Sequence, residues 1–285
     1  MRALLLLLFL KEKQTGQIKG RACINGEPQR AYIWKEEAAS PIVLTESTFI
    51  MAAIAASENK KVRCYDVLST FVNTDVNKDV LMVLKGKLAT MLLNISLEVY
   101  QRYMTADRKG TPVLYVKLQK ALYALMRASL LFYRKLRLEL EAYGFKVNIY
   151  DPCVANLESP GGKQLTVIWH VDNLMAMCKE DFELTKFLCY LAKKYGTKLA
   201  MHTGCEHDFL GMDMEFTSKG TLQVSMITYL KNMKTGFPEM ITGKVATPAA
   251  DCLFTIREEK EAKPLEQGRR AAFHHTVAQL LFMST

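Results

Sequence analysis

Residues 165–178 read Leu165-Thr-Val-Ile-Trp-His170-Val171-Asp172-Asn173-Leu174-Met-Ala-Met-Cys178. Two apolar runs, each long enough for a strand, flank a short polar tip, and Asp and Asn both tolerate tight turns. The pattern therefore predicts a β-hairpin that presents the carboxylate of Asp172 at its tip. A carboxylate displayed in this way is a candidate metal ligand.

A second candidate acid lies in an earlier apolar run. Residues 64–71 read Cys-Tyr-Asp66-Val67-Leu-Ser-Thr-Phe71, which predicts a short strand that ends near Asp66. Hard divalent cations take oxygen ligands, and carboxylates from separate parts of a fold can meet at such an ion. Spacing alone does not join Asp66 to Asp172, because most aspartates are solvated surface groups.

Two amphipathic helices are predicted around these strands. In residues 129–143 the apolar side chains recur at spacings of three and four, and Gly144 supplies the stop. Residues 181–195 follow the same pattern, with Asp181 as the N-cap and Gly196 at the end. Further strands are predicted at 209–216 and 222–226. Helices packed on one face of an antiparallel sheet give the fold class α+β.

Composition favours a folded, basic protein. The chain has 285 residues, of which 49% are hydrophobic, so it can bury a substantial core. Its 38 Lys and Arg against 29 Asp and Glu give a net charge of +9, which favours polyanionic partners, although many soluble proteins are basic without binding nucleic acid. Seven cysteines with no C-x-x-C pair argue against a disulfide framework or a structural zinc site.

The leucine-rich start of the chain allows a competing interpretation. Residues 1–10 resemble the core of a signal peptide, yet they continue directly into Lys11-Glu12-Lys13 without a small-residue cleavage site. No stretch reaches the ~18 apolar residues that a spanning helix requires. We therefore expect a cytoplasmic or nuclear protein without a membrane partner, and keep a secreted or membrane-surface protein as a weaker alternative.

Several motifs occur in a fixed order along the chain. They are Asp66-x-x-x-Thr-Phe71, residues 116–127 (Val-Lys-Leu-Gln-Lys-Ala-Leu-Tyr-Ala-Leu-Met-Arg), Tyr143-Gly-Phe145, Tyr150-Asp-Pro-Cys153, His170-Val-Asp172 and Phe209-Leu-Gly211, followed by Ala246-Thr-Pro-Ala249 and residues 273–281 (Phe-His-His-Thr-Val-Ala-Gln-Leu-Leu). In this order they resemble the reverse transcriptase, an RNA-dependent DNA polymerase, of copia-type long-terminal-repeat retrotransposons. The resemblance runs from about Phe9 to the last residue.

The resemblance implies a right-hand polymerase fold of fingers, palm and partial thumb, with an antiparallel palm sheet backed by helices. Residues 4–13 would form the first fingers strand, which explains the leucines as core. The implied division is 1–62 and 75–130 for the fingers, 63–74 and 131–217 for the palm, and 218–285 for the start of the thumb or connection.

The resemblance also assigns the catalytic centre. Asp66 and Asp172 match the two catalytic acids, and with the Val67 carbonyl and Asn173 they would form the site for two Mg²⁺ ions, or Mn²⁺. The partners implied are an RNA template, a DNA primer and a deoxynucleoside triphosphate. Oligomeric state is left open.

Further residues match substrate-binding positions. Lys19 and Arg21 would hold the triphosphate, although they would also suit a solvated strand edge. Phe71 would screen the sugar against a ribose 2′-hydroxyl, or be an ordinary core residue. Arg127 stands where many relatives carry Gln beside the nucleotide, and Ala124 replaces a customary Gly.

The primer end is the remaining part of the implied site. His170 stands where relatives often carry Tyr, and its ring would pack beside the primer terminus without ligating a metal. Phe209, Leu210 and Gly211 resemble the element that grips the primer, although a packed strand would contain the same residues.

Asn173 is the main departure, because the usual tip carries a second Asp at this position. An amide offers an oxygen but no charge, and losing one preorganised charge costs about a hundredfold in rate. We expect a weakened or inactive polymerase, with a non-catalytic nucleic-acid-binding remnant as the alternative. The sequence also ends without a segment resembling ribonuclease H, so we expect a truncated element that does not replicate alone.

Overall fold

The computed structural model describes residues 3–12, 16–76, 79–159, 162–196, 199–240 and 264–284, with the single residues Gly243, Ala246 and Thr255. Most of the motif at 246–249 lies outside these residues. The chain forms two compact units: residues 1–209 with 215–222, and residues 210–214 with 223–285.

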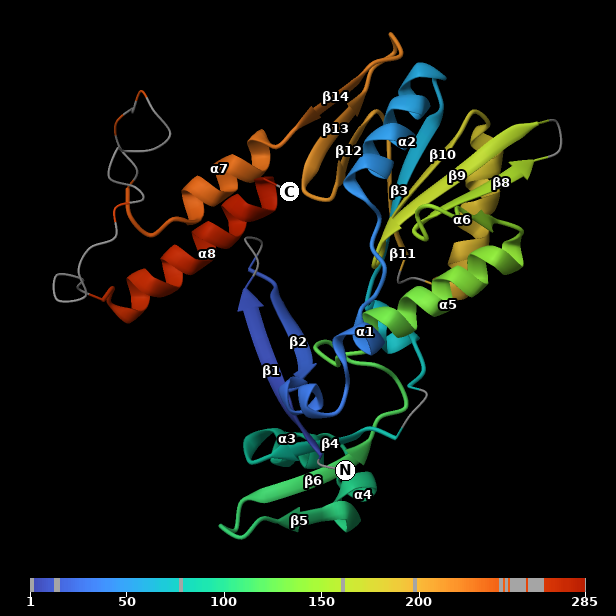
Figure 1. Cartoon of the computed structure of the whole chain (residues 1–285). Helices are drawn as coiled ribbons and strands as arrows, with labels where there is room; N and C mark the ends of the chain where they lie inside the picture. Colours follow the sequence, from blue (N-terminus) through green and yellow to red (C-terminus); the bar gives the residue numbers. More distant parts are fainter. Residues whose placement is uncertain are drawn as a thin grey trace. The chain divides into compact units, whose positions relative to one another are not determined.

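A five-stranded sheet carries the N-terminal strands (Figure 1). β1 pairs antiparallel with β2 and parallel with β4, and a small core that includes Leu4 and Ile24 lies beneath. The strand order is β2 (Ile18–Ile24), β1 (Leu4–Glu12), β4 (Leu81–Lys85), β6 (Pro112–Lys117) and β5 (Met104–Ala106).

The first leucines form the predicted strand but do not all enter a core. Leu4 is buried, whereas Leu8, Phe9 and Leu10 are exposed. The reason is that the outer half of β1 pairs only with β2, beyond its two-residue pairing with β4, so the hairpin projects as a two-stranded ribbon. The interpretation of these leucines as core is therefore confirmed for Leu4, holds in part for the half-buried Leu6 and Leu7, and is wrong for Leu5, Leu8 and Leu10.

The larger sheet has six antiparallel strands. Their order is β11 (Leu199–Thr203), β3 (Lys61–Val67), β10 (Asn173–Cys178), β9 (Lys163–His170), β8 (Val154–Ser159) and β7 (Lys146–Val147). Almost every side chain of the central strands is buried, including Leu174, Met175 and Ala176 at 0% exposure. This sheet therefore forms the main core of the first unit.

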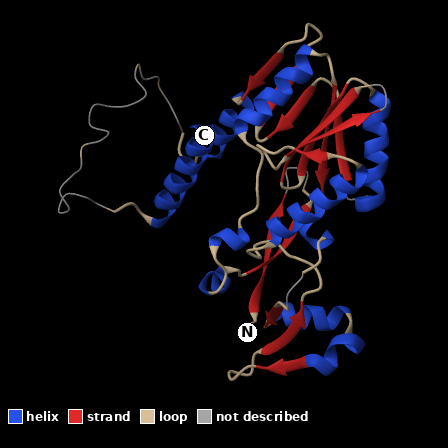
Figure 2. Ribbon diagram, turned by 45° about the vertical axis from the view of Figure 1, so that its right-hand side comes forward, coloured by secondary structure: helices blue, strands red, loops and turns tan. Residues whose placement is uncertain are grey.

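Helices α5 (Ala128–Tyr143) and α6 (Asp181–Tyr195) pack against this sheet (Figure 2). Tyr133 of α5 stacks on Trp169, and Phe187 of α6 meets Tyr65 edge-on. Both predicted helices and the α+β fold class are confirmed. One detail differs, because Glu180 is the N-cap and Asp181 is the first helical residue, where its carboxylate pairs with Arg63 at 2.7 Å.

Shorter elements complete the first unit. They are η1 (Glu27–Ala31), α1 (Lys35–Ala38), α2 (Thr45–Ser57), η2 (Thr70–Asn73), α3 (Lys87–Ile95), α4 (Leu97–Tyr100) and η3 (Gln101–Tyr103). In the segments described, no helix is both long and apolar enough to cross a bilayer.

The boundary between the units passes through a three-stranded sheet of β12 (Glu206–Phe209), β13 (Met212–Phe216) and β14 (Leu222–Ser225). The strand predicted at 209–216 forms only over 212–216, because Leu210 and Gly211 have φ values of 56° and 73° and form a turn. Successive left-handed residues are typical of two-residue hairpin turns. The strand predicted at 222–226 is confirmed as β14. Helices α7 (Ile227–Gly236) and α8 (Gln267–Ser284) follow.

Candidate active site

The hairpin at the centre of the six-stranded sheet has the predicted geometry. β9 ends at His170, β10 begins at Asn173, and Val171 and Asp172 form the turn between them. Val171 has a φ of 55°, which is strained for a β-branched residue and persists only where the surrounding structure holds it. The prediction that Asp172 lies at the tip is confirmed.

Strand register brings the two candidate acids together. Asn173 lies opposite Asp66 of β3 and also opposite His170 of β9, so these three residues form one row across the sheet. The Val67 N–H donates to the Asp172 carbonyl at 3.0 Å, which ties the turn to the end of β3. Residues paired in this way have neighbouring Cβ atoms on the same face.

The adjacent row explains why this register is fixed. Tyr65, Leu174 and Trp169 are paired in the same way and are buried, and two of them contact aromatic residues of α5 and α6. Side chains alternate between faces along a strand, so the row with Asp66 faces away from these helices. Slipping the register by one residue would turn that buried row outward.

The electrostatics agree with close carboxylates. Burial raises the pKa of Asp66, the Asp172 carboxylate raises it further, and Lys19 opposes both effects. When one carboxylate raises the pKa of another in this way, the two negative charges repel each other, and a bound cation would relieve that repulsion. Burial lowers the pKa of His170, against the effect of Asp172, and its buried Nδ1 has no hydrogen-bond partner among the residues described.

The two candidate cations lie on the exposed ribbon. Lys19 and Arg21 occupy alternate positions of β2, so they share one face of it. Lys19 is within electrostatic range of Asp66, and the Arg21 guanidinium carbon lies 5.7 Å from the centroid of the Tyr123 ring. The structure thus brings the ribbon cations toward the carboxylates.

The sequence left two roles open for Phe71, a screen beside the sugar and an ordinary core residue. It is half-buried against the small core of the five-stranded sheet, and its ring meets Tyr123 edge-on at 4.9 Å between centroids. It belongs to η2, which follows the strand of Asp66 after a short turn. Its role at the sugar stays a prediction.

Tyr123 is a site residue that the sequence did not single out. Its carbonyl accepts the N–H of Ile24 at 2.9 Å, and its ring contacts both Phe71 and Arg21. Burial raises the pKa of Tyr123, and the Asp172 carboxylate adds to the effect while Arg21 opposes it. This tyrosine lies within the motif at 116–127, but the motif assigned it no role, because its position depends on three distant segments meeting.

Ala124 adopts a conformation that suits glycine. Its φ is 65°, and its carbonyl oxygen packs so closely on Gly26 that a Cβ at residue 26 would overlap it. The Gln29 side-chain oxygen accepts the N–H of Met126 at 3.1 Å and fixes the same loop. The resemblance implies a glycine where this chain has Ala124, and the positive φ at this position is one physical reason for a glycine there. A close approach of the backbone to substrate would be a second reason.

Arg127 is engaged elsewhere in the unit. Its guanidinium forms an ion pair and hydrogen bond with Glu37 of α1, and its buried Nε has no hydrogen-bond partner in the described chain. A role for Arg127 beside the nucleotide would require this pair to open, and stays a prediction.

The four residues predicted to contact the primer end do not all belong to the same compact unit. His170 stands beside Asp172, as described above. Phe209 is fully buried at the end of β12, where packing alone accounts for it, whereas Leu210 and Gly211 belong to the second unit. Their role at the primer end stays a prediction.

The predicted metal site would combine two charged candidate ligands with two neutral ones. The Val67 carbonyl already accepts the hydroxyl of Thr70, although a carbonyl has a second lone pair. Within the ranges described, no group of three or more His, Cys, Asp or Glu side chains could hold a metal ion. Asp66 and Asp172 suit a divalent cation, and Asn173 adds an oxygen without charge.

Comparisons with known proteins identify a family. Residues 7–250 match the family described as reverse transcriptase (RNA-dependent DNA polymerase). The chain is 24% identical over 262 residues to a retrovirus-related Pol polyprotein from transposon TNT 1-94 of Nicotiana tabacum, and 25% identical over 243 residues to that from transposon RE2 of Arabidopsis thaliana. The alignments cover 91% and 85% of this chain but only 18% and 15% of those polyproteins.

Solved telomerase structures also match at low similarity. Telomerase from Candida albicans, in complex with the TWJ fragment of telomeric RNA, gives a TM-score of 0.37 at 8% identity over 82% of this chain and 50% of that one. Telomerase from Candida tropicalis gives 0.42 at 10% identity over 78% and 44%. On the family match, which covers most of its length, the chain belongs to the reverse transcriptase (RNA-dependent DNA polymerase) family.

Proposed function

We propose that this chain is the RNA-directed DNA polymerase domain of a copia-like retrotransposon, and that Asn173 reduces its activity. It would extend a DNA primer on an RNA template by nucleotidyl transfer from a deoxynucleoside triphosphate. The observation that carries the proposal is the β3–β10 register, which joins Asp66 to the hairpin tip with Asp172. The family match supports the same reaction.

Each site residue has a defined task in this proposal. Asp66 and Asp172 would hold divalent metal ions, with the Val67 carbonyl and the Asn173 amide oxygen as neutral ligands. When bound, a Mg²⁺ pair lowers the pKa of the attacking hydroxyl and stabilises the leaving pyrophosphate. The Asp172 carboxylate adds to the rise in the pKa of Asp66, which shows that the two carboxylates repel each other. A bound cation would relieve that repulsion.

The remaining residues would orient the substrates. Lys19 and Arg21 would bind the triphosphate as paired cations, and Phe71 would exclude a 2′-hydroxyl. Arg127 would reach the nucleotide after release from Glu37. His170, with Phe209, Leu210 and Gly211, would position the primer end. The fingers, palm and thumb bounds given above, and a cytoplasmic or nuclear location, form part of the same proposal.

Asn173 weakens the centre because it lies directly opposite Asp66. Aspartate here would place a third negative charge beside the metal ions, whereas the amide leaves their charge less compensated. We expect a rate deficit of about a hundredfold relative to Asn173→Asp. Excess Mg²⁺ or Mn²⁺ would recover part of the loss by mass action.

Primer extension tests the proposal directly. The purified chain and Asn173→Asp are compared on poly-rA primed with oligo-dT, at low millimolar Mg²⁺ and then with Mn²⁺. We expect slow extension by the natural chain and much faster extension by Asn173→Asp. Equal rates in Mg²⁺ would refute the damaged-site hypothesis, and no extension by either protein in either metal would refute the polymerase.

A second candidate function is a non-catalytic nucleic-acid-binding remnant. The neutral Asn173 and the net charge of +9 favour it. Binding would then weaken steeply with salt, because phosphate contacts release counterions. Salt-dependent binding of template-primer without extension in either metal, by both proteins, is the result that selects this alternative.

A further inference from the structure

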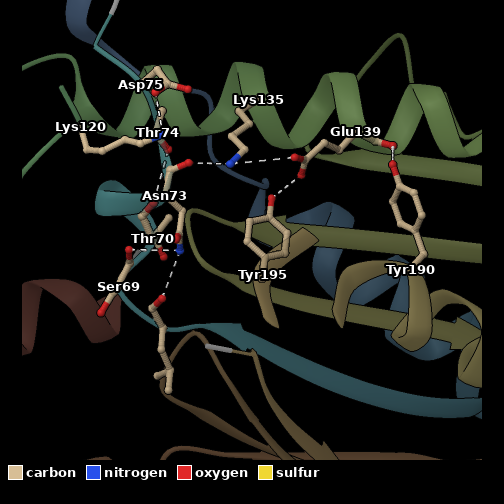
Figure 3. Close-up of polar contacts among 11 residues, drawn as sticks. Ser69, Thr70, Asn73, Thr74, Asp75, Lys120, Lys135, Glu139, Tyr190 and Tyr195 are labelled. Atoms are coloured by element: carbon tan, nitrogen blue, oxygen red, sulfur yellow. Dashed lines mark hydrogen bonds and ion pairs between the residues drawn. The ribbon is translucent and has the colours of Figure 1, made fainter. Parts of the chain in front are cut away.

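A lysine on helix α5 reaches the segment that carries Phe71. The Lys135 Nζ donates to the main-chain carbonyl of Asn73 at 2.5 Å (Figure 3). Asn73 is the last residue of η2, and Phe71 lies two residues before it. The contact therefore joins the helix that backs the large sheet to the short segment that follows the strand of Asp66.

The lysine is itself held by residues from two helices. Glu139, one turn along α5, lies 4.0 Å from the Lys135 Nζ. Its carboxylate accepts the Tyr195 hydroxyl at 2.5 Å, and its main-chain carbonyl accepts the Tyr190 hydroxyl at 2.7 Å. Figure 3 shows these contacts as one series from α6 through Glu139 and Lys135 to Asn73.

One member of this series is deeply buried. Tyr195 is only 4% exposed, and its pKa is raised by burial first and by Glu139 second, so its phenol stays protonated and remains a donor. The Lys135 Nζ also lies 5.4 Å from the centroid of the Tyr195 ring, within cation–π range. The same tyrosine thus restrains both Glu139 and Lys135.

The segment carrying Phe71 closes on itself by local contacts. The Thr74 N–H donates to the Phe71 carbonyl at 3.0 Å, and the Val72 N–H to that of Ser69 at 3.1 Å. Ser69 has a φ of 55°, an unfavourable conformation for a non-glycine residue. Three contacts from outside orient this segment: the Ala121 N–H donates to the Thr74 carbonyl at 2.9 Å, the Phe71 ring meets Tyr123, and Lys135 donates to the Asn73 carbonyl. Of these three, the Lys135 contact comes from helix α5.

We propose that Lys135, supported by Glu139 and Tyr195, is a positioning residue that sets the place of Phe71 and so the discrimination between deoxyribonucleotides and ribonucleotides. The inference rests on the proposed function, in which Phe71 screens the sugar. Displacements of about 1 Å at such a position have large kinetic effects. Loss of the lysine donor would allow η2 to shift and admit a 2′-hydroxyl.

The test compares incorporation of dTTP and UTP on poly-rA primed with oligo-dT, in an Asn173→Asp background. We expect Lys135→Met to lower the ratio of kcat/KM for dTTP over UTP by about tenfold. Lys135→Arg keeps a donor and should restore most of the ratio. An unchanged ratio in Lys135→Met, while Phe71→Val lowers it, would overturn the proposal.

Arg137→Met is the matched control. Arg137 lies on the same helix and pairs with Glu141 at 2.9 Å, the same i,i+4 spacing as Lys135 and Glu139. The Arg137→Met substitution removes one cation and one ion pair from α5 and leaves the Lys135 contact to Asn73 in place. A fall in discrimination as large as that of Lys135→Met would show a general effect of the helix and would also overturn the proposal.

Hydrogen exchange separates this inference from the polymerase assignment. If the Asn173→Asp parent extends no primer, the proposed function fails, and the amides of Val72 and Thr74 then decide whether Lys135 fixes η2. We expect about tenfold faster exchange in Lys135→Met, and in Glu139→Gln should the first variant not fold, with no change in Arg137→Met. Equal exchange in all variants would refute the positioning role.

Discussion

The six-stranded sheet and the β1–β2 ribbon both contribute to the candidate site, but they hold their residues in different ways. Asp66 lies in β3, and Asp172 lies in the turn that leads into β10, where Leu174 and Met175 are fully buried. Lys19 and Arg21 lie on an exposed ribbon of two strands. The carboxylates are therefore placed by packing, whereas the cations act mainly through their charge.

This difference predicts how each region responds to substitution. A change at a packed position that leaves the core intact removes one defined interaction, so its effect is large and specific. A change at an exposed cation alters a field that water and salt already screen, so its effect is smaller and depends on ionic strength.

The largest effect is expected at Asp66. Asp66→Asn in the Asn173→Asp background removes a metal-binding charge from an exposed side chain, and should lower the rate of primer extension by about a thousandfold. Thermal unfolding should stay close to that of the parent, because the side chain is not in the core. Retained extension would show that this acid is not catalytic, and the assignment of the packed sheet as the catalytic region would fail.

Tyr123 lies where the two regions meet, so we expect an intermediate effect. Tyr123→Ala removes an edge-on aromatic contact and a cation–π contact, together worth about 2 kcal/mol, or roughly thirtyfold in kcat/KM for the nucleotide. Tyr123→Phe keeps the ring and should stay near the parent in steady-state primer extension. If both variants lose the same activity, the hydroxyl rather than the ring is the important group.

The same contrast explains which parts the sequence predicted. Helices 129–143 and 181–195 and the hairpin with Asp172 were predictable, because their periodicity and stop residues are local. Joining Asp66 to Asp172 needed the family resemblance, since no local pattern encodes the register of strands far apart in the sequence. Tyr123 and Lys135 escaped prediction because their roles arise only where separate segments meet.

Two mistaken expectations have the same physical origin. The strand predicted through Leu210 alternates correctly in polarity, but polarity does not report the left-handed backbone that makes a turn there. The leucines of β1 read as core, yet burial depends on how many strands cover them, and most of β1 has only β2 beside it.

A smaller effect is expected from Lys19. Lys19 lowers the pKa of Asp66, so Lys19→Gln should raise that pKa above its already raised value in the metal-free protein, as measured by carboxyl NMR titration. A carboxyl whose pKa is higher in the fold than in the unfolded chain opposes folding once the pH rises through that range, so the variant should lose stability as pH rises from acid to neutral.

High salt should reduce the Lys19 effect, because the lysine is exposed and its field is screened. Its loss should lower primer extension by about fivefold at most. A salt-independent shift, or a shift to lower pKa, would contradict the view that the ribbon acts through charge. Lys11→Gln is the matched control. Lys11 lies opposite Lys19 on the neighbouring strand of the ribbon, but of the two only Lys19 acts on the pKa of Asp66, so this variant should leave that pKa unchanged.

The smallest effect concerns Ala124, whose φ of 65° costs about 1–2 kcal/mol for a residue with a Cβ. Ala124→Gly removes that cost but makes the unfolded chain more flexible, which offsets about 0.4–1 kcal/mol, so a net gain of about 0.5 kcal/mol in unfolding free energy is expected in urea. Ala121→Gly is the control, since Ala121 is buried and has no positive φ, and should be destabilising by about 1 kcal/mol. Because the substitution removes only one methyl group, the surface exposed on unfolding hardly changes, so the gain should appear without a change in the denaturant slope. A loss of stability in both variants would show that the Ala124 methyl contributes packing that outweighs its backbone strain.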